Sequence, residues 1–236
     1  MRLSDGVRDN PYVTWEAFPA ERRGGGIGAA KPAGIVRISC ADVRETGAQE
    51  RTRRIVEVPS DVAKRLASIR KDQPEDSETR YDDLMDLVTR TQRQVAKERI
   101  LRLVNRRDYS RRELEERLER DGYDNDATES VLDGLAECGI VSDGRFAEVF
   151  VRSKVSAGWG TERIVRELGR HGIDVNDLAG WPYDYIDPDA EFGRAISAAR
   201  KKCSGSRTLT YHQVARFLVG RGFSCDVACA AAREVV

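Results

Sequence analysis

The sequence contains few residues that could form a metal centre or a catalytic site. Its two histidines, His171 and His212, are well separated in the chain, and its five cysteines include no CxxC pair. A structural zinc site needs four Cys or His ligands at short spacings, and a catalytic histidine needs a partner that orients it. We therefore expect a protein with reduced thiols that is not an enzyme and holds no metal or cofactor.

The sequence also lacks a surplus of charge and a long apolar run. Forty basic residues balance forty acidic ones, and the mean hydropathy is −0.56. No apolar stretch approaches the roughly 18 residues of a membrane span, and the start of the chain lacks the apolar run of a signal peptide. These features predict a cytoplasmic protein without a membrane segment. Because 34% of the residues are charged, a thin, elongated architecture is favoured over one large core.

The first third of the chain divides into segments of different composition. Residues 1–33 combine GGGIG with three prolines and show no sustained periodicity, so we predict that they are largely disordered. Residues 34–70 hold two short runs of alternating apolar residues and then a helical pattern, which predicts a small hairpin-plus-helix module. Residues 71–80 are highly charged and are predicted to link this module to a helical domain over 81–236.

From there the sequence repeats itself at a spacing of fifty residues. Each copy has a residue suited to a helix N-cap, namely Ser110, Gly160 and Thr210. Each then has an apolar pair four residues apart: Leu114 and Leu118, Ile164 and Leu168, and Val214 and Leu218. Each ends on a glycine followed by an apolar residue: Gly122 and Tyr123, Gly172 and Ile173, and Gly222 and Phe223. This pattern is typical of a capped helix that stops at a left-handed glycine.

The repeat predicts a mainly α fold with three tandem three-helix units over about 95–141, 142–187 and 188–236. The capped helices should cover roughly 111–121, 161–171 and 211–221, and Pro182 should shorten the third helix of the second unit. A unit of this length cannot bury its apolar stripe alone. We therefore expect the units to stack into an elongated, curved array that follows a partly disordered N-terminal extension with a small β-hairpin.

Three segments carry a resemblance to a known family. In the second unit, SDGRFAEVFVRSKVSAGWGTERIVRELGRHGID (142–174) contains Asp143, Arg145-Phe146-Ala147, Val151-Arg152-Ser153, Gly158, Gly160, Ile164, Glu167-Leu168 and Gly172-Ile173. The first unit has DYSRRELEERLERDGYD (108–124), and the third has FLVGRGFS (217–224). Together these segments resemble the RecX family, whose members regulate the bacterial RecA recombinase filament. The resemblance covers the chain from about Val95 to Val236.

The resemblance implies a monomeric helical protein that docks in the groove of a RecA filament on single-stranded DNA. There it would limit filament assembly, ATP hydrolysis and strand exchange, and so regulate recombination, DNA repair and the SOS response. It implies no active site. The family tends to be basic, whereas this chain is neutral, so the binding surface must come from local clusters.

Basic clusters of the second and third units are the candidate binding surface. Three arginines share one face of the second capped helix, and the stretch from Phe192 to Cys225 holds seven basic residues and no acidic one. The predicted partner-binding residues are Arg152, Lys154, Arg163, Arg166, Arg170, Arg200, Lys201, Lys202 and Arg207. A weak direct contact with DNA is also expected of such clusters. For any single arginine, a solvated position balanced by nearby carboxylates is the simpler interpretation.

Two other functions fit the sequence. Short three-helix units resemble helix-turn-helix domains, so a module that binds DNA directly is one alternative. The capped helices share no common basic face, which argues against it. A peptide-binding helical scaffold is the other alternative, although few spare aromatic residues are available to line its groove. Trp159 could stack on a base, but packing in the turn between two helices is the simpler role for it.

Overall fold

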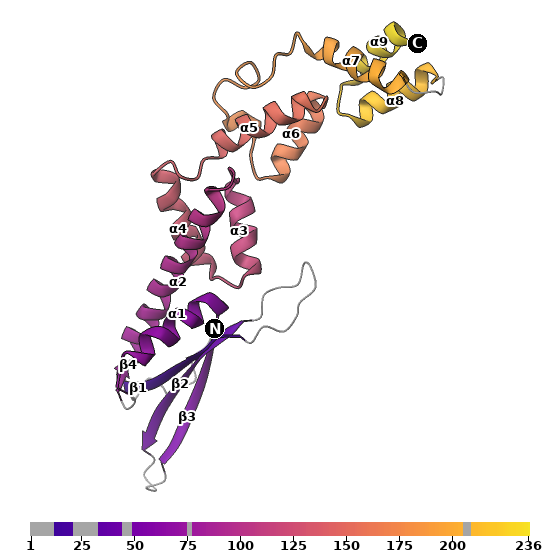
Figure 1. The fold of residues 1–236 in the computed structure, drawn as a ribbon. Helices are drawn as coiled ribbons and strands as arrows, with labels where there is room; N and C mark the ends of the chain where they lie inside the picture. The colour runs from indigo at the N-terminus through magenta and orange to yellow at the C-terminus, as the bar shows by residue number, and fades with distance from the viewer. Residues whose placement is uncertain (1–11, 21–32, 44–48, 75–76, 205–208) are drawn as a thin grey trace. The chain divides into compact units, whose positions relative to one another are not determined.

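The computed structural model describes residues 12–20, 33–43, 49–74, 77–204 and 209–236 (Figure 1). These residues form two compact units. The first contains the described residues up to Arg106 together with Leu114–Cys138, and the second contains Arg107–Glu113 together with the described residues from Gly139 to Val236.

The first unit begins with a four-stranded antiparallel sheet. Its strands are β1 (Tyr12–Phe18), β2 (Gly34–Val43), β3 (Gln49–Val58) and β4 (Thr79–Arg80), in the order β3-β2-β1-β4. Strands β2 and β3 form the predicted hairpin, and helix α1 (Ser60–Lys71) follows directly after β3. Figure 1 shows this hairpin as two long neighbouring arrows.

The sheet is held against α1 by alternating apolar side chains. On β1, Val13 and Trp15 are buried, and on β2, Val36 and Ile38 are buried. The facing residues of α1 are Val62, Ala63 and Leu66, all fully buried. Alternate residues of a strand point to the same face, so this spacing places one face of the sheet on the helix.

The prediction of disorder is wrong for Tyr12–Phe18, which form strand β1. The alternation of Val13 and Trp15 is too short to stand out from its surroundings, and the strand is stabilised by pairing with β2 and burial on α1. Residues 1–11 and 21–32 of the predicted disordered segment lie outside the described residues. The predicted linker also differs at its ends, since Lys71 closes α1 and Thr79–Arg80 form β4.

The rest of the described chain is helical, in agreement with the predicted mainly α class. The first repeat consists of α2 (Tyr81–Val104), α3 (Arg111–Arg120) and α4 (Asn125–Glu137). The second consists of α5 (Asp143–Ser156), α6 (Thr161–Arg170) and the 3-10 helix η2 (Val175–Asp177). The third consists of α7 (Glu191–Cys203), α8 (Tyr211–Gly220) and α9 (Cys225–Val235).

The glycine stops are confirmed in all three repeats. Gly122, Gly172 and Gly222 have φ angles of 83°, 79° and 88°, in the left-handed region that a side chain disfavours. The apolar residue after each glycine turns back onto the core: Tyr123, Ile173 and Phe223 are 5%, 5% and 0% exposed. The backbone N–H of each donates to the carbonyl of the buried leucine in the preceding helix, which is Leu118, Leu168 or Leu218.

The N-caps follow the predicted pattern as well. Thr210 and Gln213 form a complete capping box, and the Ser110 hydroxyl accepts from the backbone N–H of Glu113 at 3.2 Å. The third helices of the repeats begin after caps by Asp124, Asp174 and Ser224.

The second repeat is the irregular one. Its third helix is reduced to η2, and the chain then turns through a cis peptide bond between Trp181 and Pro182. Leu178 and Ile186 of this segment complete the core formed by α5 and α6. The third repeat instead has a core of small residues, mostly alanines of α7 and α9, around Phe223. None of the helices in the described residues is long and apolar enough to span a membrane.

Candidate partner-binding site

The second and third repeats meet through backbone groups at the start of α6. The N–H of Gly160 donates to the carbonyl of Arg221 at 2.9 Å, and the N–H of Glu162 donates to that of Gly222 at 3.0 Å. The carboxylate of Glu191, the first residue of α7, accepts from the N–H of Thr161 at 2.9 Å. The first turn of a helix has N–H groups without partners inside the helix, so the next repeat satisfies them here.

A related junction joins the first turn of α3 to the second repeat. The N–H of Arg111 donates to the carboxylate of Asp143, the first residue of α5, at 2.8 Å. A side-chain Cβ added at Gly172 would lie 3.1 Å from the Cβ of Arg112, so this glycine packs on the first turn of α3. Gly222 packs in the same way on Arg163, in the first turn of α6. Within the second unit, a glycine stop and a carboxylate thus meet the first turn of a helix at both places, Gly172 and Asp143 at α3 and Gly222 and Glu191 at α6.

The basic face of α6 is organised by Trp159. The Arg163 guanidinium carbon lies 3.8 Å from the centre of the indole ring, and the Lys154 ammonium lies 4.9 Å from it. The ring itself is half-buried against the core of the second repeat. Trp159 thus packs in the turn between α5 and α6, as expected, and it also holds two cations in place.

The arginines of α6 differ in how far they project. Arg166 and Arg170 are exposed, and Arg170 pairs with Glu167 at 2.7 Å. Arg163, in contrast, is half-buried. Its stem lies against Gly222, and its head group lies over Trp159. On α5, Arg152 is exposed and pairs with Glu148 at 2.5 Å.

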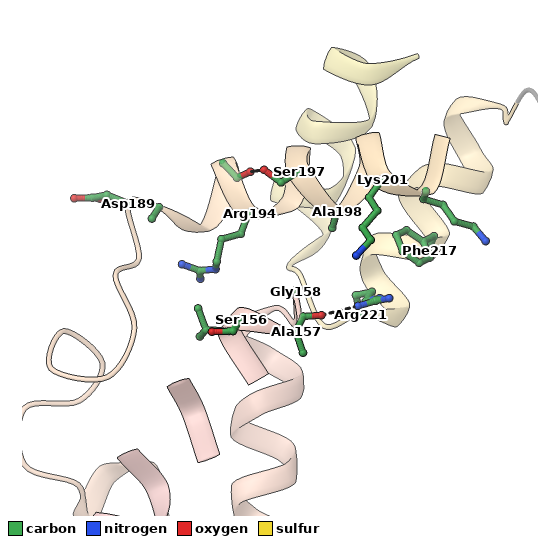
Figure 2. A pocket seen from close by; sticks show the side chains of 14 residues that line it. Ser156, Ala157, Gly158, Asp189, Arg194, Ser197, Ala198, Lys201, Phe217 and Arg221 are labelled. Atoms are coloured by element: carbon green, nitrogen blue, oxygen red, sulfur yellow. Dashed lines mark hydrogen bonds between the residues drawn. The ribbon is translucent and has the colours of Figure 1, made fainter. Parts of the chain in front are cut away.

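A second group of cations surrounds a cavity between α5, α7 and α8. The cavity has a volume of about 830 Å³. Figure 2 shows the side chains of Arg194 and Lys201 reaching from α7 toward the end of α5, where Ser156 and Gly158 lie. Arg221, directly after the end of α8, reaches across to this segment, and its guanidinium donates to the carbonyl of Ala157 at 2.9 Å.

The structure thus divides the predicted residues between two places. Lys154, Arg163, Arg166 and Arg170 belong to the surface around Trp159 and α6, which we call the α6 face, and Arg152 is on α5. Lys201 and Lys202 line the cavity, whereas the exposed Arg200 on the same helix does not. Arg207 lies outside the described residues.

Sequence reasoning missed two cations of the cavity, Arg194 and Arg221, as site residues. Both belong to the stretch from Phe192 to Cys225, which has no acidic residue, and this surplus of positive charge is the sequence feature that could have identified them. Their role depends on the packing of α7 and α8 beside the end of α5, and a pattern along one helix does not report that packing.

Several basic residues near the first repeat have structural partners. Arg99, buried except for about a fifth of its side chain, forms an ion pair with Asp121. Arg107 binds Glu113 at 2.9 Å and lies over the ring of Tyr109. His171 lies 3.7 Å from Glu113 and 5.0 Å from the ring of Phe146, which makes it a packing residue. For these positions the interpretation of locally balanced charge holds.

Comparisons with known proteins show that the sequence of the repeats is similar to a family of regulatory proteins. Two family models match the chain: "RecX, first three-helix domain" over residues 96–135 and "RecX, second three-helix domain" over residues 142–178. The Regulatory protein RecX of Halorhodospira halophila is 38% identical over 146 residues, which is 56% of this chain and 83% of that protein. The protein of the same name from Chromohalobacter salexigens is 39% identical over 137 residues, 58% of this chain and 90% of the relative.

Solved structures share the fold. A crystal structure of RecX from Lactobacillus salivarius aligns with a TM-score of 0.52 and 20% identity, covering 61% of this chain and 96% of that one. Another crystal structure of a regulatory protein RecX aligns with a TM-score of 0.58 and 18% identity, covering 84% of this chain and 95% of that one.

Proposed function

The chain belongs to the RecX family of regulatory proteins, and from this premise we propose that it regulates a RecA-type recombinase filament on single-stranded DNA. In this proposal it acts as an inhibitor that occupies the filament groove and limits assembly, ATP hydrolysis and strand exchange. The protein contributes a shaped, charged surface and performs no chemistry itself.

The observation that carries the proposal is the α6 face. Arg163 and Lys154 are held over Trp159, and the exposed Arg166 and Arg170 extend the same helix. Cations fixed by packing lose less side-chain freedom on binding than mobile ones do, which favours a specific complex. An acidic or phosphate-bearing groove would therefore meet a preorganised basic surface.

Charge is expected to act mainly on the rate of encounter. The chain has no net charge, so attraction to a filament must arise from this local surface. Exposed charges raise association rates and make them sensitive to salt, while buried contacts control the lifetime of a complex. Inhibition by the protein should consequently weaken as the salt concentration rises.

The test compares two equivalent positions of the repeat. Arg170 and Arg120 are fifty residues apart, both exposed and both the last residue of a capped helix. Arg170→Glu should weaken inhibition of ATP hydrolysis by a preformed filament several-fold, and combining it with Arg166→Glu should weaken it further. Arg120→Glu makes the same change in the first repeat and should have little effect. Arg163 is left intact because it supports Trp159 and the repeat junction.

Equal inhibition by the parent, Arg120→Glu and the Arg166→Glu/Arg170→Glu double variant would reject the α6 face as the binding surface. Affinity for bare single-stranded DNA is measured in parallel. A loss that appears equally on bare DNA and on the filament would favour the direct DNA-binding function instead, because such binding depends on phosphate contacts alone.

A further inference from the structure

The cavity between α5, α7 and α8 combines an apolar floor with a cationic rim. Its apolar lining residues, which we call the floor, are Val155, Ala157, Ala198 and Phe217, and its cationic lining residues, which we call the rim, are Arg194, Lys201, Lys202 and Arg221. Asp189 is the single carboxylate among the described residues of the lining. A ligand that fits both parts needs negative charge and an aliphatic or aromatic portion. At about 830 Å³ the cavity is within the range of sites that bury a ligand of drug size.

Arg194 shows which chemical group the rim is suited to hold. Its Nη1 donates to the carbonyl of Asp187 at 3.0 Å. Its Nε and Nη2 are shielded from water and have no hydrogen-bond partner among the described residues. These two nitrogens form one edge of the guanidinium, and their N–H groups are parallel, which matches the two oxygens of a carboxylate.

The surroundings of Phe217 favour a peptide over a nucleic acid. The Arg221 guanidinium lies 5.2 Å from the ring centre and the Lys202 ammonium lies 5.5 Å from it. Because both cations already lie over the ring of Phe217, a nucleobase could stack on that ring only by displacing them. An aliphatic side chain could instead rest on Val155 and Ala198 while a neighbouring carboxylate meets the rim.

We propose that this cavity binds an acidic segment of a protein partner. The Arg194 side chain turns its unpaired edge, which is shielded in this structure, toward one carboxylate of the segment, and an adjacent aliphatic side chain rests on the apolar floor. The cavity borders the α6 face, because residues 155–158 line it and Lys154 and Trp159 belong to that face, but its cations are different residues. The proposal rests on the proposed function only for the idea that the partner is a protein. Lys201 and Lys202 would then contact the partner through this cavity.

The experiment measures binding of a fluorescein-labelled peptide that alternates two glutamates with one leucine, by fluorescence anisotropy on the full-length protein without any recombinase. Arg194→Lys keeps the charge but removes the paired donors, so it should weaken binding about tenfold. Arg200→Lys makes the same change on an exposed residue of α7 outside the cavity and should leave the affinity unchanged. Thermal melting of each variant checks that it is folded.

A second variant, Lys201→Gln with Lys202→Gln, changes only exposed residues and should weaken binding several-fold, more so at low salt. Equal affinity of the parent and Arg194→Lys for the peptide, or no binding by the parent, would overturn the proposal. So would displacement of the peptide by an oligothymidylate of equal charge at lower concentration, which would assign the cavity to phosphates. None of these outcomes bears on the filament assay with Arg170→Glu, which tests the proposed function separately.

Discussion

Alanine at each of the three helix-ending glycines should separate backbone strain from contact between repeats. Gly122, Gly172 and Gly222 share nearly the same positive φ, between 79° and 88°. Placing an L side chain in this region costs about 1 kcal/mol. If backbone strain were the only effect, the three substitutions would destabilise the protein by similar amounts.

The surroundings of the three glycines differ sharply. A Cβ at Gly122 would meet no atom within 4 Å. At Gly172 it would lie 3.1 Å from the Cβ and 3.2 Å from the Cδ of Arg112, a side chain that can move by a few tenths of an ångström. At Gly222 it would lie 2.5 Å from the backbone N and 2.8 Å from the Cα of Arg163, and closer still to its Cβ. Backbone atoms inside a helix cannot make that room, so the junction has to separate.

These differences set the expected magnitudes. Gly122→Ala should cost about 1 kcal/mol, from strain alone, and Gly172→Ala between about 1 and 2 kcal/mol. Gly222→Ala should cost about 3 kcal/mol or more. It adds to the strain the loss of two hydrogen bonds, from Gly160 to Arg221 and from Glu162 to Gly222, at roughly 1 kcal/mol each.

Urea unfolding followed by far-ultraviolet circular dichroism measures the three changes in the free energy of unfolding. Each variant is compared with the parent protein in the unfolding transition of the unit that contains the glycine. Asparagine at the same positions is the control, since it tolerates positive φ but still carries a Cβ. Gly122→Asn should be nearly neutral, whereas Gly222→Asn should remain as harmful as Gly222→Ala. Losses of equal size at Gly122 and Gly222 would refute the close packing of the third repeat on the first turn of α6.

Two further predictions concern single side chains. The buried hydroxyl of Tyr123 has no hydrogen-bond partner among the described residues, and burial raises the pKa of Tyr123 to about 12. Tyr123→Phe should therefore leave the free energy of unfolding unchanged or increase it by up to about 1 kcal/mol, and the melting temperature should stay the same or rise accordingly. Because the raised pKa favours the neutral phenol in the folded state, its stabilising effect is present below pH 10 and is lost between about pH 10 and 12. Thermal melts across that range should show a smaller loss for Tyr123→Phe than for the parent, and identical pH profiles would contradict this. Glu191→Ala removes the acceptor for the Thr161 N–H and should cost about 1 kcal/mol in the urea assay, whereas Glu234→Ala, at an exposed site on α9, should cost little.

Features that depend on neighbouring residues could be read from the sequence. The capped helices end within one residue of their predicted positions, and each stops at its predicted glycine. Caps, apolar stripes and glycine stops act over about one or two turns of helix, so the residues that form them lie close together in the chain. The shortened third helix before Pro182 could be predicted for the same reason.

Strand β1 shows where this approach failed. Val13 and Trp15 are buried, yet only two alternating residues carry the signal, and proline and glycine lie on both sides of the segment. What makes Tyr12–Phe18 a strand is the pairing with β2, whose partner residues lie about twenty positions away. A short strand gains its stability from such partners, and its own sequence is a weak guide.

The candidate site combines both kinds of information. The sequence by itself determined the repeat, its helices and the presence of basic residues on the second and third units, because local backbone preferences and helical periodicity decide these. Only the tertiary structure decided that Arg163 is held by Trp159 and that Arg194 and Arg221 surround one cavity. It also decided that Gly222 packs against Arg163 in the first turn of α6, whereas a Cβ at Gly122 would meet no atom within 4 Å. These properties arise when residues tens of positions apart in the sequence come within a few ångströms of one another. The periodicity of a single helix predicts which of its faces is buried, but it does not predict which other element packs against that face.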